Sequence, residues 1–186
     1  MDTLLIIRHA ETDLAGRFCG HSNPPVNERG FGQIGKLLNV LKNESIDSVY
    51  VSDLARSLMT ADAIGRAFGL LPIVLPDLRE IDFGEWEGLN WEEIEARDRA
   101  YAQQWAEDYP NLPAPGGETF EAFRSRVLTQ INLLLAVSAR RCGAVVTHAG
   151  VMRVVLRSLC GLDEREAWER SKAYCGFFRY QAGRLA

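Results

Sequence analysis

Apolar residues occur along the chain in short uninterrupted runs that alternate with longer stretches of helical spacing. The first run is Leu4 to Ile7, and such a series of large apolar residues is typical of a strand buried on both faces of a parallel sheet. Similar runs predict further strands at 48–51, at 72–75, within 144–150 and within 175–183.

Between these runs, apolar residues return every three or four positions, as they do on one face of a helix. Asn27 is a candidate cap for the first helix, predicted at 26–42, whose apolar face comprises Phe31, Ile34, Leu38 and Leu41. Further helices are predicted at 52–69, 91–107, 118–140 and 151–161.

Strands that alternate with helices predict an α/β protein, built as a three-layer α/β/α sandwich. A chain of 186 residues, of which 47% are hydrophobic, is long enough for one sizeable core. We therefore expect a single domain over residues 1–186. The stretch 88–117 contains the Pro/Gly loop "YPNLPAPGGE" and interrupts the alternation, so it is predicted to be an insertion.

The formal net charge of −4 gives no general attraction for nucleic acid or for an anionic membrane, so neither is expected as a partner. The four cysteines are scattered without a C-x-x-C pair, which predicts free thiols and no metal site. Free thiols are typical of a reducing compartment, and the sequence shows neither a signal-peptide pattern nor a membrane-length apolar stretch. These features predict a cytoplasmic protein.

The glycines of "GFGQIGK", residues 30–36, match the spacing of nucleotide-binding loops. However, the preceding "SNPPVNER" is not a strand, and Leu37 stands where a P-loop needs serine or threonine. We interpret these residues as helix glycines and expect no cofactor.

Two of the chain's three histidines, His9 and His148, each follow an apolar strand. If the two strands are parallel neighbours, both histidines lie at one sheet edge, where α/β proteins form ligand crevices. Arg8 precedes His9, Arg56 falls in the first turn of the helix after the second strand, and Glu80 follows the third strand. The strand ends thus gather cations, imidazoles and one carboxylate.

This combination predicts transfer of a phosphoryl group from a small-molecule phosphate ester without a metal. Guanidinium groups bind phosphate oxygens bidentately, so Arg8 and Arg56 would hold the phosphoryl group. A neutral His9 imidazole would attack phosphorus. Glu80, kept protonated by an apolar wall, would give a proton to the departing oxygen.

The motifs "RHAET", "SDLARSLMTA", "LREIDFGEWEG" and "THAGVMR", in this order, resemble the histidine phosphatase superfamily, which has the phosphoglycerate mutase-like fold. The resemblance implies that His9 becomes the phosphohistidine and that Glu80 is the proton donor and acceptor. It implies that Arg8, Arg56 and the catalytic His148 bind the phosphoryl group. It also implies a mostly parallel mixed sheet and a helical insertion over the site, which 88–117 matches.

The chain departs from the family pattern at two positions. Ala10 replaces the usual glycine after the histidine, and Ala15 stands where the family often has an asparagine that contacts phosphate. Asn23, or the backbone near His21, would then supply that contact. His21, Asn23 and Glu118 are therefore taken as candidate substrate-binding residues.

The compact length, and "FGEWEG" followed by "PAPGGETFEAFRSRV", resemble the α-ribazole phosphatase branch, which acts in cobalamin nucleotide-loop synthesis. The resemblance implies a small phosphorylated metabolite such as α-ribazole 5'-phosphate. Candidates for stacking on an aromatic leaving group are Phe83, Trp86, Trp91, Trp105 and Tyr109.

Other interpretations stay open at this point. The chain could be a phosphoglycerate mutase-like or broad-specificity phosphatase, or it could bind phosphorylated ligands without turnover. A metallohydrolase would use His9, His21, His148 and Asp13, although no H-x-x-x-H or paired-aspartate spacing supports a metal site. Whether the chain forms a homodimer is also left open.

Overall fold

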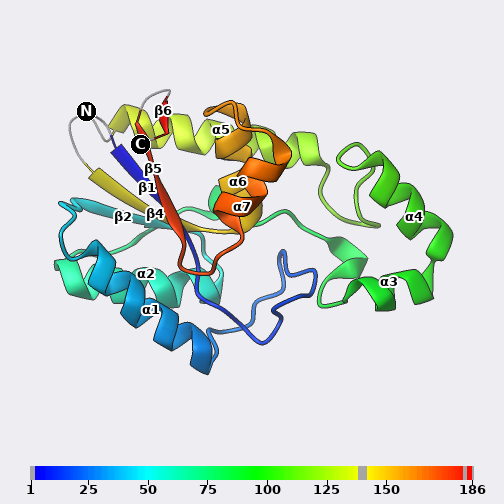
Figure 1. Ribbon diagram of the computed structural model, residues 1–186, viewed down its shortest axis with the longest axis horizontal. Coiled ribbons are helices and arrows are strands. Elements are labelled where there is room, and N and C mark those ends of the chain that lie inside the picture. Colours follow the sequence, from blue (N-terminus) through cyan, green and yellow to red (C-terminus); the bar gives the residue numbers. More distant parts are fainter. Residues whose placement is uncertain (1–2, 138–141, 182–183, 186) are drawn as a thin grey trace.

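The computed structural model describes residues 3–137, 142–181 and 184–185 and has three layers, with a six-stranded sheet between two layers of helices (Figure 1). One face of the sheet is covered by α1 (Glu28–Leu41) and α2 (Ala55–Phe68). The other face is covered by α5 (Phe120–Val137), α6 (Ala149–Ser158) and α7 (Glu164–Ser171). The predicted α/β/α sandwich is therefore confirmed.

The strands are ordered β3-β2-β4-β1-β5-β6 across the sheet. The parallel part comprises β1 (Thr3–Arg8), β2 (Ser48–Val51), β3 (Ile73–Val74) and β4 (Cys142–Thr147). At one edge, β5 (Phe177–Gln181) pairs antiparallel with β1, and β6 (Arg184–Leu185) pairs antiparallel with β5. The sheet is mixed and mostly parallel, as the family resemblance implied.

The central strand β1 explains why an uninterrupted apolar run stands at the start of the chain. Leu4 and Ile6 belong to the core cluster that includes residues of α5 and α6, whereas Leu5 and Ile7 belong to the cluster that includes residues of α1 and α2. All of them are 0% exposed, because successive side chains of a strand point to opposite faces and both faces are covered. Burial of each such side chain contributes about 1.5–3 kcal/mol to the stability of the folded chain.

The helices of the predicted insertion lie beyond one end of the sheet (Figure 1). They are α3 (Trp91–Arg97) and α4 (Arg99–Asp108), and two short 3-10 turns precede them, η1 (Pro76–Leu78) and η2 (Gly84–Trp86). Trp86 of η2, Ile94 of α3, Ala102 of α4 and Ala114 form a separate core cluster.

Several boundaries differ from those predicted. The helix expected at 91–107 is two helices, because Asp98 ends α3 and its side chain accepts a hydrogen bond from the Tyr101 amide at 3.0 Å, which caps α4. Phe31, expected on the buried face of α1, is 55% exposed. The predicted ends at 138–140 and 182–183 lie outside the described residues. Within the described ranges, no helix is long and apolar enough to cross a membrane.

Candidate active site

The ends of β1 and β4 bring two histidines together. Arg8 and Thr147 are paired in the parallel register, so His9 and His148 leave the sheet at the same edge. Their ring centroids lie 5.0 Å apart, and the His9 amide donates to the Thr147 carbonyl at 2.9 Å. The expectation that these strands are parallel neighbours is therefore confirmed.

The hydrogen bonds of His9 determine its tautomer. Nδ1 lies 2.6 Å from the carbonyl oxygen of Ala10, which can only accept, so Nδ1 carries the hydrogen. Nε2 accepts a hydrogen bond from Nε of Arg56 at 3.2 Å. Burial, and then the charges of Arg56 and Arg8, hold the pKa of His9 well below its ordinary value of 6.5. The ring is thus neutral, with the lone pair on Nε2.

The alanine that replaces the family glycine after His9 is accommodated. Ala10 is buried, and its amide donates to Oγ1 of Thr60 at 3.0 Å. Among the described residues, Ala10 is not one of those with positive φ, so its backbone does not require glycine.

His148 is buried and presents one ring nitrogen without a partner. Its Nε2 lies 2.7 Å from Oγ of Ser52 and 3.3 Å from Oγ of Ser57. Nδ1 has no hydrogen-bond partner among the described residues, and it carries the ring hydrogen in the tautomer whose Nε2 accepts from a serine hydroxyl. Burial, and then the charge of Arg56, lower the pKa of His148 well below 6.5. The ring therefore offers a buried N–H donor next to His9.

Arg8 is held at the same sheet edge by the segment after α7. Its guanidinium carbon lies 3.8 Å from the centroid of the Tyr174 ring, and one terminal nitrogen donates to the carbonyl oxygen of Lys172. Its Nε is buried and, within the described ranges, has no hydrogen-bond partner, like Nδ1 of His148. Two buried N–H groups near His9 are thus available to an anion.

Arg56 is fully buried, but most of its guanidinium is already occupied. The terminal nitrogens donate to the carbonyl oxygens of Ser22 at 2.6 Å, Gly20 at 2.7 Å and Cys19 at 3.2 Å, and Nε donates to His9. The expected bidentate fork toward a phosphate is therefore not present in this arrangement. Only the Nε side of Arg56 faces the reacting nitrogen.

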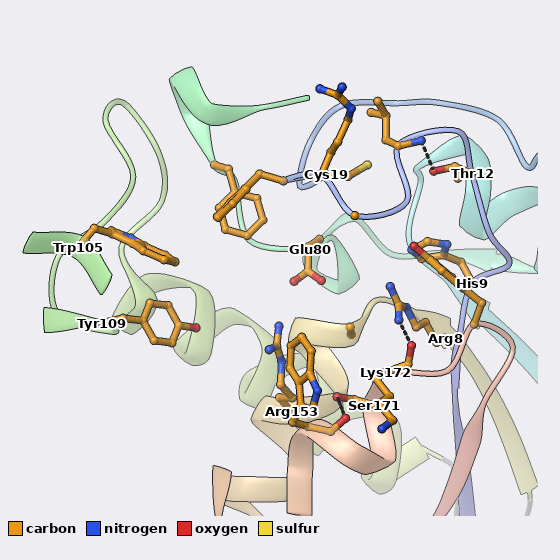
Figure 2. A pocket seen from close by; sticks show the side chains of 18 residues that line it. Arg8, His9, Thr12, Cys19, Glu80, Trp105, Tyr109, Arg153, Ser171 and Lys172 are labelled. Atoms are coloured by element: carbon orange, nitrogen blue, oxygen red, sulfur yellow. Dashed lines mark hydrogen bonds between the residues drawn. The ribbon is translucent and has the colours of Figure 1, made fainter. Parts of the chain in front are cut away.

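Glu80 lies beside the first turn of α6. Its Oε2 accepts a hydrogen bond from the Gly150 amide at 2.8 Å, and its Oε1 accepts one from the Ile81 amide at 3.0 Å. These amide contacts replace the predicted apolar wall. Figure 2 shows the carboxylate pointing into the open middle of the cavity.

The cavity beside these residues has a volume of about 460 Å³ (Figure 2). Arg8, His9 and Glu80 line it, whereas Arg56 and His148 are not among the lining residues. The rest of its lining includes aromatic and cationic side chains: Phe18, Phe83, Trp105, Tyr109 and Trp168, and Arg17, Arg153 and Lys172. Of the aromatic residues proposed from the sequence, Trp86 and Trp91 pack in the cluster of the insertion instead.

The candidate substrate-binding residues His21, Asn23 and Glu118 do not line this cavity. His21 has its Nδ1 3.3 Å from a carboxylate oxygen of Asp82. Asn23 accepts a hydrogen bond from the Ala55 amide at 2.6 Å and so caps the start of α2. In this structure these two polar side chains contact Asp82 and the start of α2, and their contact with substrate stays a prediction.

Glu118 pairs with Arg126 through two hydrogen bonds of 2.8 Å. Arg126 also donates to the carbonyl oxygens of Asp77, Arg79 and Glu80 at 2.8–2.9 Å. Glu118 is therefore connected through Arg126 to the backbone that carries Glu80, and it is not among the residues that line the cavity.

The arrangement gives no support to the metallohydrolase alternative. His21 lies beside Asp82, apart from His9 and His148, and Asp13 does not line the cavity. In the described part of the chain, no group of three or more His, Cys, Asp or Glu side chains could hold a metal ion.

Residues missed by sequence reasoning come mainly from α6 and from the segment around α7. Arg153 lies five positions after His148 and was part of the quoted "THAGVMR", so its position on the first turns of α6 was a usable signal. Trp168, Lys172 and Tyr174 follow no strand and belong to no recognised motif, so nothing marked them.

Comparisons with known proteins agree with this geometry. The profile of the histidine phosphatase superfamily (branch 1) matches residues 4–183. The chain is 31% identical over 167 residues to an adenosylcobalamin/alpha-ribazole phosphatase of Salmonella typhimurium, covering 89% of this chain and 83% of that protein. It is also 31% identical over 170 residues to phosphoserine phosphatase 1 of Hydrogenobacter thermophilus, covering 90% and 81%.

Among solved structures, the alpha-ribazole phosphatase of Shigella flexneri superposes with a TM-score of 0.88 at 26% identity, covering 99% of this chain and 93% of that chain. The profile match, the relatives and the fold all lead to one assignment. This chain belongs to the histidine phosphatase superfamily, branch 1, and is a phosphatase.

Proposed function

We propose that this chain hydrolyses a small phosphomonoester through a phosphohistidine formed on His9, with Glu80 transferring the protons. The observation that carries the proposal is the state of the His9 ring, which has its hydrogen on Nδ1 and its lone pair on Nε2. Because its pKa is lowered by burial and by two arginines, the ring stays neutral at physiological pH. A neutral imidazole at the wall of a cavity is a competent nucleophile.

In the first step, Nε2 of His9 attacks phosphorus, and the bond from phosphorus to the ester oxygen breaks. Glu80 in its protonated form gives its proton to that oxygen. In the second step, water attacks the phosphohistidine, Glu80 takes a proton from the water, and the phosphorus–nitrogen bond breaks to release inorganic phosphate. His9 is then neutral again, and the proton taken from water replaces the one that Glu80 gave to the ester oxygen.

The charge that develops on the phosphoryl oxygens needs preorganised donors. Arg8 and His148 supply them through Nε and Nδ1, which are buried and have no hydrogen-bond partner among the described residues. Arg56 adds the positive charge nearest to Nε2 of His9. These donors are in place before the substrate binds, so no reorganisation is needed during the reaction.

For the substrate, we propose α-ribazole 5'-phosphate. The support is the 31% identity to an adenosylcobalamin/alpha-ribazole phosphatase and the aromatic walls of the cavity. Phe83, Trp105 and Tyr109 line the cavity, and Trp168 faces it from α7. Rings of this kind stack favourably on a heteroaromatic base.

A second candidate substrate is a phosphate ester whose leaving group carries a carboxylate, such as phosphoserine or a phosphoglycerate. It is favoured by Arg153, which lines the cavity, has its guanidinium carbon 5.0 Å from the centroid of the Trp168 ring, and has no ion-pair partner among the described carboxylates. The relationship to phosphoserine phosphatase 1 agrees with it.

Phosphate release from α-ribazole 5'-phosphate, phosphoserine, 3-phosphoglycerate and p-nitrophenyl phosphate decides between the candidates. We expect the highest kcat/KM for α-ribazole 5'-phosphate and full activity in EDTA. Arg153→Met should then lower kcat/KM similarly for all esters. A loss confined to the carboxylated esters favours the second candidate, and tight binding of all four esters without turnover favours the non-catalytic alternative.

The cytoplasmic location stays a prediction. Whether the chain forms a homodimer stays open. The free state of all four cysteines supports a reducing compartment.

A further inference from the structure

The carboxylate of Glu87 is surrounded by backbone amides. Its oxygens accept hydrogen bonds from the successive amides of Gly20, His21 and Ser22 at 2.7–3.1 Å, and from the Phe83 amide at 3.1 Å. Successive amides that converge in this way form a concave anion site, here filled by a side chain of the same chain. Glu87 therefore fixes the path of the loop at 20–22.

The opposite side of the same loop holds Arg56. The carbonyl oxygens of Cys19, Gly20 and Ser22 accept the hydrogen bonds of its terminal nitrogens. The loop thus presents its amides to Glu87 and its carbonyls to Arg56. Among the described residues no carboxylate contacts Arg56 directly, so the position of its guanidinium depends on the loop.

Gly20 shows how little this loop can shift. A Cβ at this position would lie 2.0 Å from the carbonyl oxygen of Ile81 and 2.5 Å from Oε1 of Glu87. Both contacts are far below a normal van der Waals separation. The loop is therefore pressed against the segment 81–87, with only a hydrogen atom between them.

We propose that Glu87 is a positioning residue for phosphoryl transfer, which holds the 20–22 loop so that Arg56 keeps its Nε on Nε2 of His9. The inference rests on the proposed function, because it assigns Glu87 a part in the reaction of His9. Burial lowers the pKa of Arg56, and the negative charge of Glu87 is among the charges that oppose this effect. Glu87 thus supports Arg56 both through the loop and through space.

A double-mutant cycle tests the coupling, with kcat/KM for p-nitrophenyl phosphate as the first readout. Glu87→Ala should lower kcat/KM about 10- to 100-fold, the scale for a displaced catalytic group. In the Arg56→Lys background the same change should cost less than about 3-fold, because the group that Glu87 positions is already lost. Glu87→Gln keeps one acceptor oxygen and should recover part of the activity. Glu85→Gln is the matched control, because Glu85 is exposed in the same segment.

The affinity for inorganic phosphate, measured by calorimetry, is the second readout of the same cycle. The phosphate affinity tests the coupling of Glu87 and Arg56 without any turnover. A lack of phosphatase activity in the unmodified protein would therefore contradict the proposed function but not this inference. If Glu87→Ala does not fold, Glu87→Gln enters the cycle in its place. Additive losses in both readouts, or an unchanged activity and phosphate affinity in the Glu87 variant, would overturn the inference.

Discussion

Nδ1 of His9 lies 2.6 Å from the carbonyl oxygen of Ala10 and therefore carries the ring hydrogen. This single contact leaves Nε2 as the nitrogen with the lone pair. Arg56 lies against that nitrogen, and together with burial it keeps the ring neutral. The chemistry expected of the site and its dependence on pH both follow from this state.

The first prediction concerns stability against pH. Burial lowers the pKa of both His9 and His148 well below 6.5, so the unfolded chain binds protons that the folded chain does not. The contribution of the two neutral histidines to the free energy of unfolding is complete above about pH 6.5. It is lost as the pH falls below that value. His148→Asn should remove one such group and make the free energy of unfolding less steep in this range, by up to about 1.4 kcal/mol per pH unit. Denaturant titrations between pH 7 and pH 5 measure the slopes, and parallel curves would contradict the prediction.

The second prediction concerns the shape of Arg56. Arg56→Lys keeps the charge, but an ammonium group cannot contact His9 and three loop carbonyls at once. We expect kcat/KM to fall. The loss of transition-state stabilisation should be about 2–4 kcal/mol, the scale for removing a preorganised donor. Arg66→Lys, an exposed change on the same helix, should have no effect. Steady-state kinetics of both variants test this, and near-normal kcat/KM in Arg56→Lys would place Arg56 outside the reaction.

The third prediction concerns the dependence on the leaving group. Glu80→Gln removes the transferable proton, so it should slow phosphorylation of His9 strongly for alkyl phosphates and mildly for p-nitrophenyl phosphate, whose leaving group needs little protonation. General acid catalysis contributes roughly 10²- to 10⁴-fold, which sets the expected gap. With p-nitrophenyl phosphate the second step should become limiting, and rapid quench should show a burst of p-nitrophenol. Equal losses for both esters without a burst would instead make Glu80 a structural residue.

The fourth prediction compares two glycines in helices. A Cβ on Gly150 would lie 2.0 Å from Oε1 of Glu80, so Gly150→Ala must displace the carboxylate and should lower kcat/KM about 10- to 100-fold. Gly32 has nothing within 4 Å of the added Cβ. Gly32→Ala should leave activity unchanged and stabilise α1 by about 0.5–1 kcal/mol. Kinetics and thermal melting of the pair test this, and equal activity in both variants would contradict the role given to Glu80.

The main features of the fold could be predicted because β1 and β4 are apolar on both faces, and such strands occur in parallel sheets covered by helices. From there, the meeting of His9 and His148 follows from the geometry of parallel strands alone. Polar residues at the carboxyl ends of buried strands thus predicted which side chains meet at one edge of the sheet.

The loop residues were harder to predict, because no periodicity fixes the path of the chain between β1 and α1. His21 and Asn23 were assigned to substrate, yet their side chains serve Asp82 and the start of α2. Glu87 was missed because its partners are backbone amides from two separate loops, which no side-chain pattern reveals. Glu118 pairs with Arg126 of α5, which also donates to the carbonyl oxygen of Glu80. No sequence pattern predicted this connection.

The central claim is that His9 carries the phosphoryl group during turnover, and rapid quench with a phosphate-labelled ester tests it most directly. We expect label on the unmodified protein that is stable in alkali and lost in acid. Label and turnover should both disappear in His9→Ala, and both should persist in His21→Ala, the control histidine outside the cavity. Label that persists in His9→Ala would contradict the account and make His148 the next nitrogen to test.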